Sequence, residues 1–268
     1  GAGGSPDALT LTGFVEETAA PDSFPLLVRA TDPETLYLVL WNSVSRKVST
    51  RQVMVPAAGN IRLGAESQVS SSRSSTSSAL RSSNAVGGTW NSKTRELTLV
   101  ITGRSGAFPQ AMWLTHLTST MTGWVVRAAE EVGGGLVQTN DRPTVLFDAR
   151  PAAGPHGQYY VYSLGLHYDD DLAVPEVHQQ IYAGDESQWI NRIMINEWTL
   201  TRNAPSATFF GDDIAWGWRL GETDAANPNR LLVFLKVSGT TGTDLTDFDD
   251  VGWISSSGLA LSLSSVRP

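Results

Sequence analysis

The chain has 268 residues, of which 41% are hydrophobic and only 17% charged, and its formal net charge is −8. This acidic balance lacks the basic face that displaces counterions from nucleic acid, so we expect no nucleic-acid partner. The sequence has no run of about 20 apolar residues, so we expect no insertion into a membrane. The absence of cysteine excludes disulfides, thiolate catalysis and cysteine-ligated zinc.

The first residues predict a flexible leader over 1–7, because Gly1–Ser5 consists of small residues with no periodic pattern. We expect residues 1–268 to form a single all-β domain with this leader at its start. The abundance of Ser, Thr, Gly and Asn with few Lys favours an extracellular or cell-surface location.

Short apolar runs rich in β-branched and aromatic residues recur along the chain and predict strands. They lie at 9–12, 36–41, 95–101, 159–162, 231–235 and 259–264. Pairs of turn-forming residues such as Asp32-Pro33 and Asn227-Pro228 separate them. The best helix candidate is 124–132, which contains good helix formers and ends at Gly133-Gly134-Gly135.

Four units recur in which a short apolar segment, a turn-rich gap and a strongly apolar strand follow one another. Their starts at Pro25, Ala79, Pro143 and Pro205 lie 54, 64 and 62 residues apart. These intervals are about the length of a four-stranded propeller blade with its loops. We therefore expect an all-β, β-propeller-like fold of four or five blades, with a β-sandwich or jelly roll as the alternative.

Residues 66–83 form a Ser-rich stretch, with 10 serines among 18 residues. A segment of this composition buries too little apolar area to form core. We expect a long exposed loop that is the most mobile internal segment, and a strand pair with a hydroxyl face is the alternative.

The segment Ser83-Asn84-Ala85-Val86-Gly87-Gly88-Thr89-Trp90 resembles the Asp-box of bacterial neuraminidase repeats, Ser-x-Asp-x-Gly-x-Thr-Trp. Ser83, Gly87, Thr89 and Trp90 match in register, and Ala85 stands where the family has Asp. In that family the box is a structural turn between strands of a propeller blade and does not touch substrate. The resemblance, over eight residues, implies a propeller blade and assigns no catalytic role.

The densest group of potential metal ligands follows the third predicted unit. Carboxylate and imidazole groups at this density could hold a hard cation such as calcium, although the spacing matches no EF-hand or His-Glu-x-x-His pattern. A solvated acidic loop is the alternative, and no motif requires a cofactor. The residues are Asp169, Asp170, Asp171, Glu176 and His178.

Tryptophans supply the predicted ligand-binding surface. In Trp216-Gly217-Trp218-Arg219 the two indoles share one side of a strand, because alternate residues of a strand point to the same face. Two such indoles beside Arg219 suit stacking on sugar rings, and the alternative is that they fill a layer of the core.

Together these features predict a non-catalytic extracellular module that binds carbohydrate or a protein surface. A structural subunit of a self-assembling particle, fibre or shell is one alternative, which would make the chain a homo-oligomer. A glycoside hydrolase on a propeller scaffold is the other. Its catalytic residues stay unassigned, because 27 acidic residues offer many carboxylate pairs and distinguish none.

Overall fold

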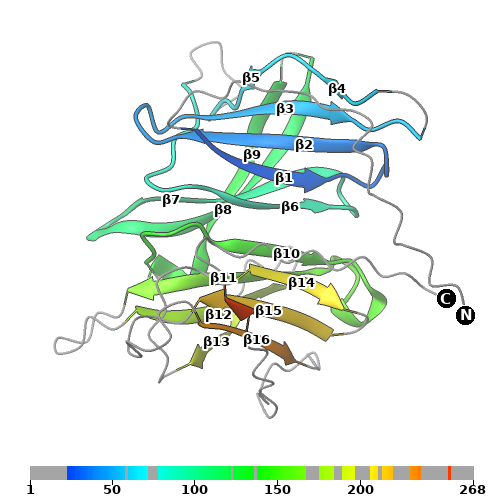
Figure 1. Cartoon of the computed structure of the whole chain (residues 1–268). Coiled ribbons are helices and arrows are strands. Elements are labelled where there is room, and N and C mark those ends of the chain that lie inside the picture. The colour runs from blue at the N-terminus through cyan, green and yellow to red at the C-terminus, as the bar shows by residue number, and fades with distance from the viewer. Residues whose placement is uncertain are drawn as a thin grey trace, which may run out of the picture.

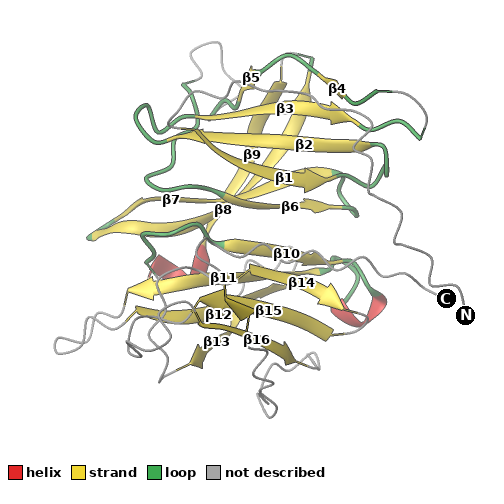
Figure 2. Cartoon of the chain, in the orientation of Figure 1, coloured by secondary structure: helices red, strands yellow, loops and turns green. Residues whose placement is uncertain are grey.

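The computed structural model describes residues 23–57, 60–71, 78–121, 123–135, 138–166, 175–183, 189–196, 206–210, 213–219, 230–236 and 253–254. Apart from the short 3-10 helices η1 (Val132–Gly135) and η2 (Pro151–Ala153), the regular structure in these ranges is strand (Figure 2). The predicted all-β fold is confirmed. Within the same ranges, the chain forms no helix that is long and apolar enough to cross a membrane.

The strands form four antiparallel sheets that follow one another along the chain. The first contains β1 (Ser23–Arg29), β2 (Thr35–Asn42), β3 (Val48–Met54), β4 (Arg62–Leu63) and β5 (Ser67–Gln68). The second contains β6 (Gly87–Asn91), β7 (Glu96–Ser105), β8 (Phe108–Thr120) and β9 (Gly123–Glu131). The third contains β10 (Thr144–Asp148), β11 (Gln158–Leu166), β12 (Pro175–Ala183) and β13 (Trp189–Asn196). The fourth contains β14 (Ser206–Phe210), β15 (Asp213–Arg219), β16 (Arg230–Lys236) and β17 (Trp253–Ile254).

The first strand of each sheet packs against the first strand of the next. Contacts join β1 to β6, β6 to β10, and β10 to β14, and Figure 1 shows these strands in succession through the molecule. Antiparallel sheets that follow one another along the chain with adjacent first strands have the order expected of propeller blades, and closure into a propeller of four or five blades stays a prediction.

The predicted repeat starts match three of the four sheets. Pro25 lies in β1, and Pro143 and Pro205 each immediately precede a first strand. The second start was wrong, because the second sheet begins at Gly87 and not at Ala79. The segment around Ala79 pairs with the first sheet instead, since the amide of Val48 in β3 donates to the Leu80 carbonyl at 3.1 Å.

The best helix candidate, 124–132, lies in strand β9 as far as Glu131, and Val132 begins the 3-10 helix η1. Pairing along β8, a strand of 13 residues, satisfies the backbone of this segment. Trp124 and Val126 also enter the core between the first and second sheets. Tertiary pairing and burial therefore override the helix propensity of the alanines and glutamates.

The Ser-rich stretch contributes to the core at both of its described ends, although its composition predicted otherwise. Val69 is fully buried and Leu80 is buried with it in the same cluster. Residues 72–77 lie outside the described part of the chain. The Asp-box-like residues Ser83–Val86 lead directly into β6, so they connect the first sheet to the second.

The second sheet is buried on both faces. Leu97 and Leu99 of β7 pack toward the first sheet, in a cluster that also holds Trp41 and Trp124. Val100 of the same strand packs on the other face against the third sheet, with Val145 and Phe147 of β10. Because neighbouring side chains of a strand point to opposite faces, β7 contributes residues to two hydrophobic cores.

Candidate functional site

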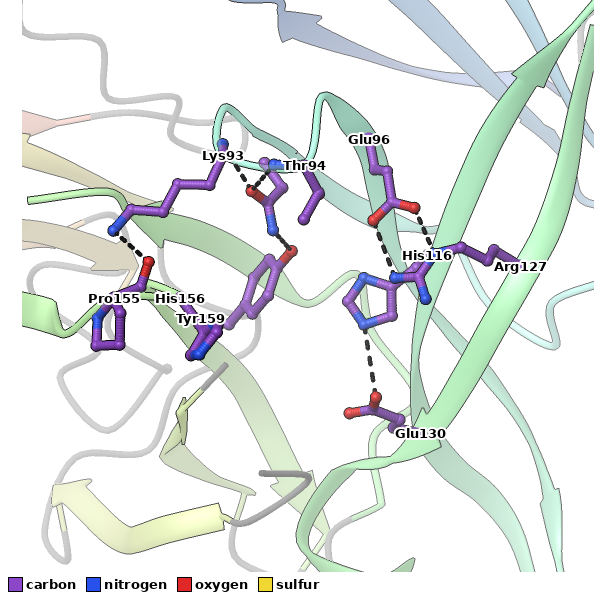
Figure 3. A pocket seen from close by; sticks show the side chains of 10 residues that line it. Lys93, Thr94, Glu96, His116, Arg127, Glu130, Pro155, His156 and Tyr159 are labelled. Carbon is purple, nitrogen blue, oxygen red and sulfur yellow. Dashed lines mark hydrogen bonds and ion pairs between the residues drawn. The ribbon is translucent and has the colours of Figure 1, made fainter. Parts of the chain in front are cut away.

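A cleft of about 670 Å³ lies between the second and third sheets (Figure 3). It occurs where the β6–β7 turn approaches the connection from β10 to β11. Strands β7, β8 and β9 line one side, and the β10–β11 connection and the start of β11 line the other. The lining residues are Asn91, Lys93, Thr94, Glu96, His116, Arg127, Glu130, Pro155, His156 and Tyr159.

The cleft arises where inward-facing positions change from apolar to polar. On β8, Met112 and Leu114 pack into the core against the third sheet, and the next residue on that face is His116. On β7, Val100 packs into this core, whereas Thr98 and Glu96 occupy the same face towards the start of the strand. Each strand therefore delivers the polar groups of the cleft at one end, beyond an apolar stretch that packs on the third sheet.

A β-bulge places Arg127 in the cleft. His116 pairs with Ala128, but Leu117 pairs with Val126, so Arg127 is the extra residue of β9. A bulge of this kind redirects a side chain. Arg127 Nε donates to Glu96 Oε1, and Arg127 Nη2 donates to Glu96 Oε2 at 3.0 Å. The carboxylate is 10% exposed and the guanidinium 45% exposed, so the pair has one buried and one open partner.

The bidentate pair stays charged at neutral pH. Burial opposes ionisation of Glu96, but hydrogen bonds from Arg127 and Thr94 and the charge of Arg127 outweigh it, so the pKa of Glu96 lies below its ordinary value. The hydrogen bond to Glu96 is the main cause that raises the pKa of Arg127. Bidentate charge-assisted bonds also fix the orientation of both groups.

His116 and Glu130 lie beside this pair. His116 Nε2 is 3.9 Å from Glu130 Oε1, and the two side chains are 6% and 23% exposed. On the other side of the ring, Nδ1 is 3.5 Å from Thr98 Oγ1. Burial is the main reason that the pKa of His116 is below its ordinary value, and the charge of Glu130 partly opposes this effect. His116 is therefore neutral at pH 7.

Tyr159 of β11 closes the cleft from the third sheet. Its hydroxyl accepts a hydrogen bond from Asn91 Nδ2 at 2.6 Å and lies 3.0 Å from Thr98 Oγ1. Its ring packs against Phe147 at a centroid distance of 4.8 Å and against His116 at 5.7 Å. The residue thus joins the apolar core between these sheets to the polar cleft.

Alkaline pH is expected to destabilise the fold through Tyr159. Burial raises the pKa of Tyr159 from 10.0 to about 12, so the native state keeps the phenol neutral while the unfolded chain ionises above pH 10. Stability from this group is complete below pH 10 and lost as pH rises towards 12, by about 2 kcal/mol. Urea unfolding at pH 9 and 11.5 measures the loss. The free energy of unfolding of Tyr159→Phe is expected to fall less than that of wild type between pH 9 and pH 11.5. An equal fall in both proteins would contradict the prediction.

Lys93 bridges the opening of the cleft. Its Nζ donates to the carbonyl oxygens of Gly154 and Pro155, at 2.9 and 3.0 Å, and Figure 3 shows it reaching from the β6–β7 turn to this connection. Because both acceptors are neutral carbonyls, these two bonds leave the positive charge of Lys93 uncompensated. Lys93 therefore places a positive charge at the opening of the cleft and also joins the β6–β7 turn to the β10–β11 connection.

The residues predicted to bind ligand lie in the fourth sheet. Trp216, Trp218 and Arg219 belong to β15, where Trp216 pairs with Phe234 of β16. The backbone confirms the strand, whereas these side chains lie outside the described part of the structure. Their contact with a ligand therefore stays a prediction.

The predicted metal ligands are only partly placed. Glu176 and His178 lie in β12, and Asp169–Asp171 lie outside the described residues. Among the residues that the structure describes, no three His, Asp or Glu side chains gather closely enough to hold a metal ion. Calcium binding stays a prediction.

Sequence reasoning missed the whole cleft. One signal was available: Glu96 and His116 are ionisable residues within strands whose other inward positions hold apolar residues, threonine or glutamine. Buried charged residues of this kind are rare unless they are paired. The partner of Glu96 could not have been found in this way, because the bulge at Arg127 leaves no trace in the apolar pattern.

Comparison with known proteins leaves the family open. No family model matches the chain, and no curated protein matches it. Among solved structures, an exo-β-1,3-galactanase from Phanerochaete chrysosporium with β-1,3-galactotriose is similar at 14% identity and a TM-score of 0.48, over 86% of this chain. This chain spans 49% of that galactanase. A complex of BT0996 with RGII is similar at 11% identity and a TM-score of 0.43, over 85% of this chain and 72% of the other protein. With both TM-scores below 0.5, these likenesses assign the chain to no family.

Proposed function

We propose that the protein binds carbohydrate in the cleft between the second and third sheets. One observation carries the proposal: the cleft is lined by hydrogen-bonding side chains whose charges cancel. Lys93 and Arg127 are positive and Glu96 and Glu130 are negative, so the formal charges of these four groups cancel, and His116 beside them is neutral at pH 7. A neutral ligand that is rich in polar groups fits such a lining.

The donors and acceptors of the lining match a sugar. Each sugar hydroxyl both donates and accepts, and the cleft offers carboxylates that accept together with guanidinium and ammonium groups that donate. The rings of His116 and Tyr159 add apolar surface between these groups. Buried polar groups that are satisfied only by the correct ligand also reject analogues lacking its hydroxyls.

A glycan array followed by calorimetry tests the proposal. Glu130→Gln is expected to weaken binding of the selected glycan about tenfold, because a charged hydrogen-bond acceptor contributes about 1.5–3 kcal/mol. Arg104→Ala, at an exposed position on β7, is the control and should bind as wild type does. Binding abolished by Trp218→Ala and unaffected by Glu130→Gln would move the site to β15. Failure to bind any glycan class would overturn the proposal.

A second candidate function is hydrolysis of a glycosidic bond. Two carboxylates, Glu96 and Glu130, line the same cleft in unlike environments, since only Glu96 has a bidentate guanidinium partner. In glycosidases, different surroundings give the two catalytic carboxyl groups different pKa values, so that one acts as the acid and the other as the base or nucleophile. Release of nitrophenol from chromogenic glycosides, lost in Glu130→Gln, would favour hydrolysis over binding alone.

A further inference from the structure

We infer that His116 makes ligand binding in this cleft pH-dependent, by competing with the ligand for the carboxylate of Glu130. The inference rests on the proposed function and deepens it. In the neutral form of His116, Glu130 is open to a ligand hydroxyl, and in the protonated form the imidazolium binds Glu130 instead.

The geometry around His116 is loose for a buried polar ring. The separations of 3.9 Å to Glu130 Oε1 and 3.5 Å to Thr98 Oγ1 both exceed the 2.7–3.2 Å of an ordinary N–H···O bond. Glu130 Oε2 is buried and has no hydrogen-bond partner among the described residues. Glu130 therefore has unused accepting capacity, and its side chain, which is 23% exposed, reaches the wall of the cleft.

Charged groups face His116 from every strand that packs around it. Glu130 and Arg127 come from β9, Glu96 comes from β7, and the Tyr159 hydroxyl comes from β11. Lys93 and His156 line the cleft further along, at its opening. Glu96 is already held by Arg127 in two hydrogen bonds. Glu130 is thus the carboxylate that remains available to an imidazolium.

Protonation changes which group Glu130 contacts. Burial holds the pKa of His116 below 6.5, so the ring is neutral at pH 7 and gains its proton on acidification. A protonated Nε2–H and the Glu130 carboxylate attract each other, and closing the 3.9 Å gap by about 1 Å forms a charge-assisted hydrogen bond. The ligand then loses an acceptor, so acid weakens its binding.

Calorimetry with the array-selected glycan at pH 7.5 and pH 5.0 is the direct test. Wild type is expected to bind more weakly at pH 5.0, and about tenfold more weakly at a pH one unit below the titration midpoint of His116 measured by nuclear magnetic resonance. His116→Gln cannot ionise and is expected to have the same affinity at both pH values, whatever its absolute affinity. Arg104→Gln, at an exposed position on β7 that does not line the cleft, is the control and should keep the pH dependence of wild type.

A measurement without ligand tests the pairing itself. Nuclear magnetic resonance of the imidazole between pH 8 and 4 follows the titration of His116, and Glu130→Gln is expected to lower its pKa further by removing a neighbouring negative charge. An unchanged titration in this variant would overturn the inference, as would equal wild-type affinities at both pH values. Absence of glycan binding at both pH values would instead overturn the proposed function, and the inference with it.

Discussion

Gly87→Ala is expected to destabilise the protein by more than about 4 kcal/mol, the largest loss that we predict for a single substitution. A Cβ atom at position 87 would lie 2.0 Å from the carbonyl oxygen of Pro143 and 2.8 Å from its carbonyl carbon. Both atoms are backbone, so no side chain can rotate away. The first strands β6 and β10 would have to separate, and the core between the second and third sheets would open with them.

Urea unfolding, followed by tryptophan fluorescence, measures this loss. Gly103→Ala is the matched control: it is also a strand glycine in the second sheet, but its added Cβ would meet nothing closer than Trp113 Cδ1 at 3.9 Å. This control should change stability by no more than about 1 kcal/mol. If Gly87→Ala unfolds at the same urea concentration as the control, β6 and β10 do not pack as closely as the structure has them.

Arg127→Met is expected to cost about 3 kcal/mol, because it leaves the buried carboxylate of Glu96 without its guanidinium partner. Glu96 has only 10% of its side chain exposed, whereas Arg127 is 45% exposed. The loss of stability therefore comes from the buried carboxylate that has lost its partner, and not from removal of the exposed guanidinium. Protonation makes this carboxylate neutral. The difference in the free energy of unfolding between wild type and Arg127→Met should therefore become smaller as the pH falls through the titration of Glu96.

A double-mutant cycle separates this effect from lost packing. The double variant Glu96→Gln/Arg127→Met should be more stable than Arg127→Met alone, because no buried charge is left unpaired. Arg104→Met, at an exposed position, controls for loss of a surface arginine and should cost less than about 0.5 kcal/mol. Equal losses from Arg127→Met and Arg104→Met would show that the bulge does not direct Arg127 onto Glu96.

Local sequence patterns were sufficient for most of the fold. The run at 36–41 falls within β2, and the run at 231–235 falls within β16. The repeat interval also located β1, β10 and β14. Local preference and tertiary environment disagree at the best helix candidate: Ala128–Glu131 favour a helix, but the long neighbouring strand β8 pairs with them as β9.

The sequence by itself determined an all-β chain with a recurring unit of several strands, because strand periodicity and turn residues are properties of neighbouring positions. Only the tertiary structure decided where polar groups converge. Glu96, His116, Arg127 and Tyr159 come from four strands and two sheets, and their meeting depends on strand register, on one bulge and on the packing of β10 against β6. A period-2 pattern records which face a residue occupies, but it does not encode which residue of another strand lies opposite.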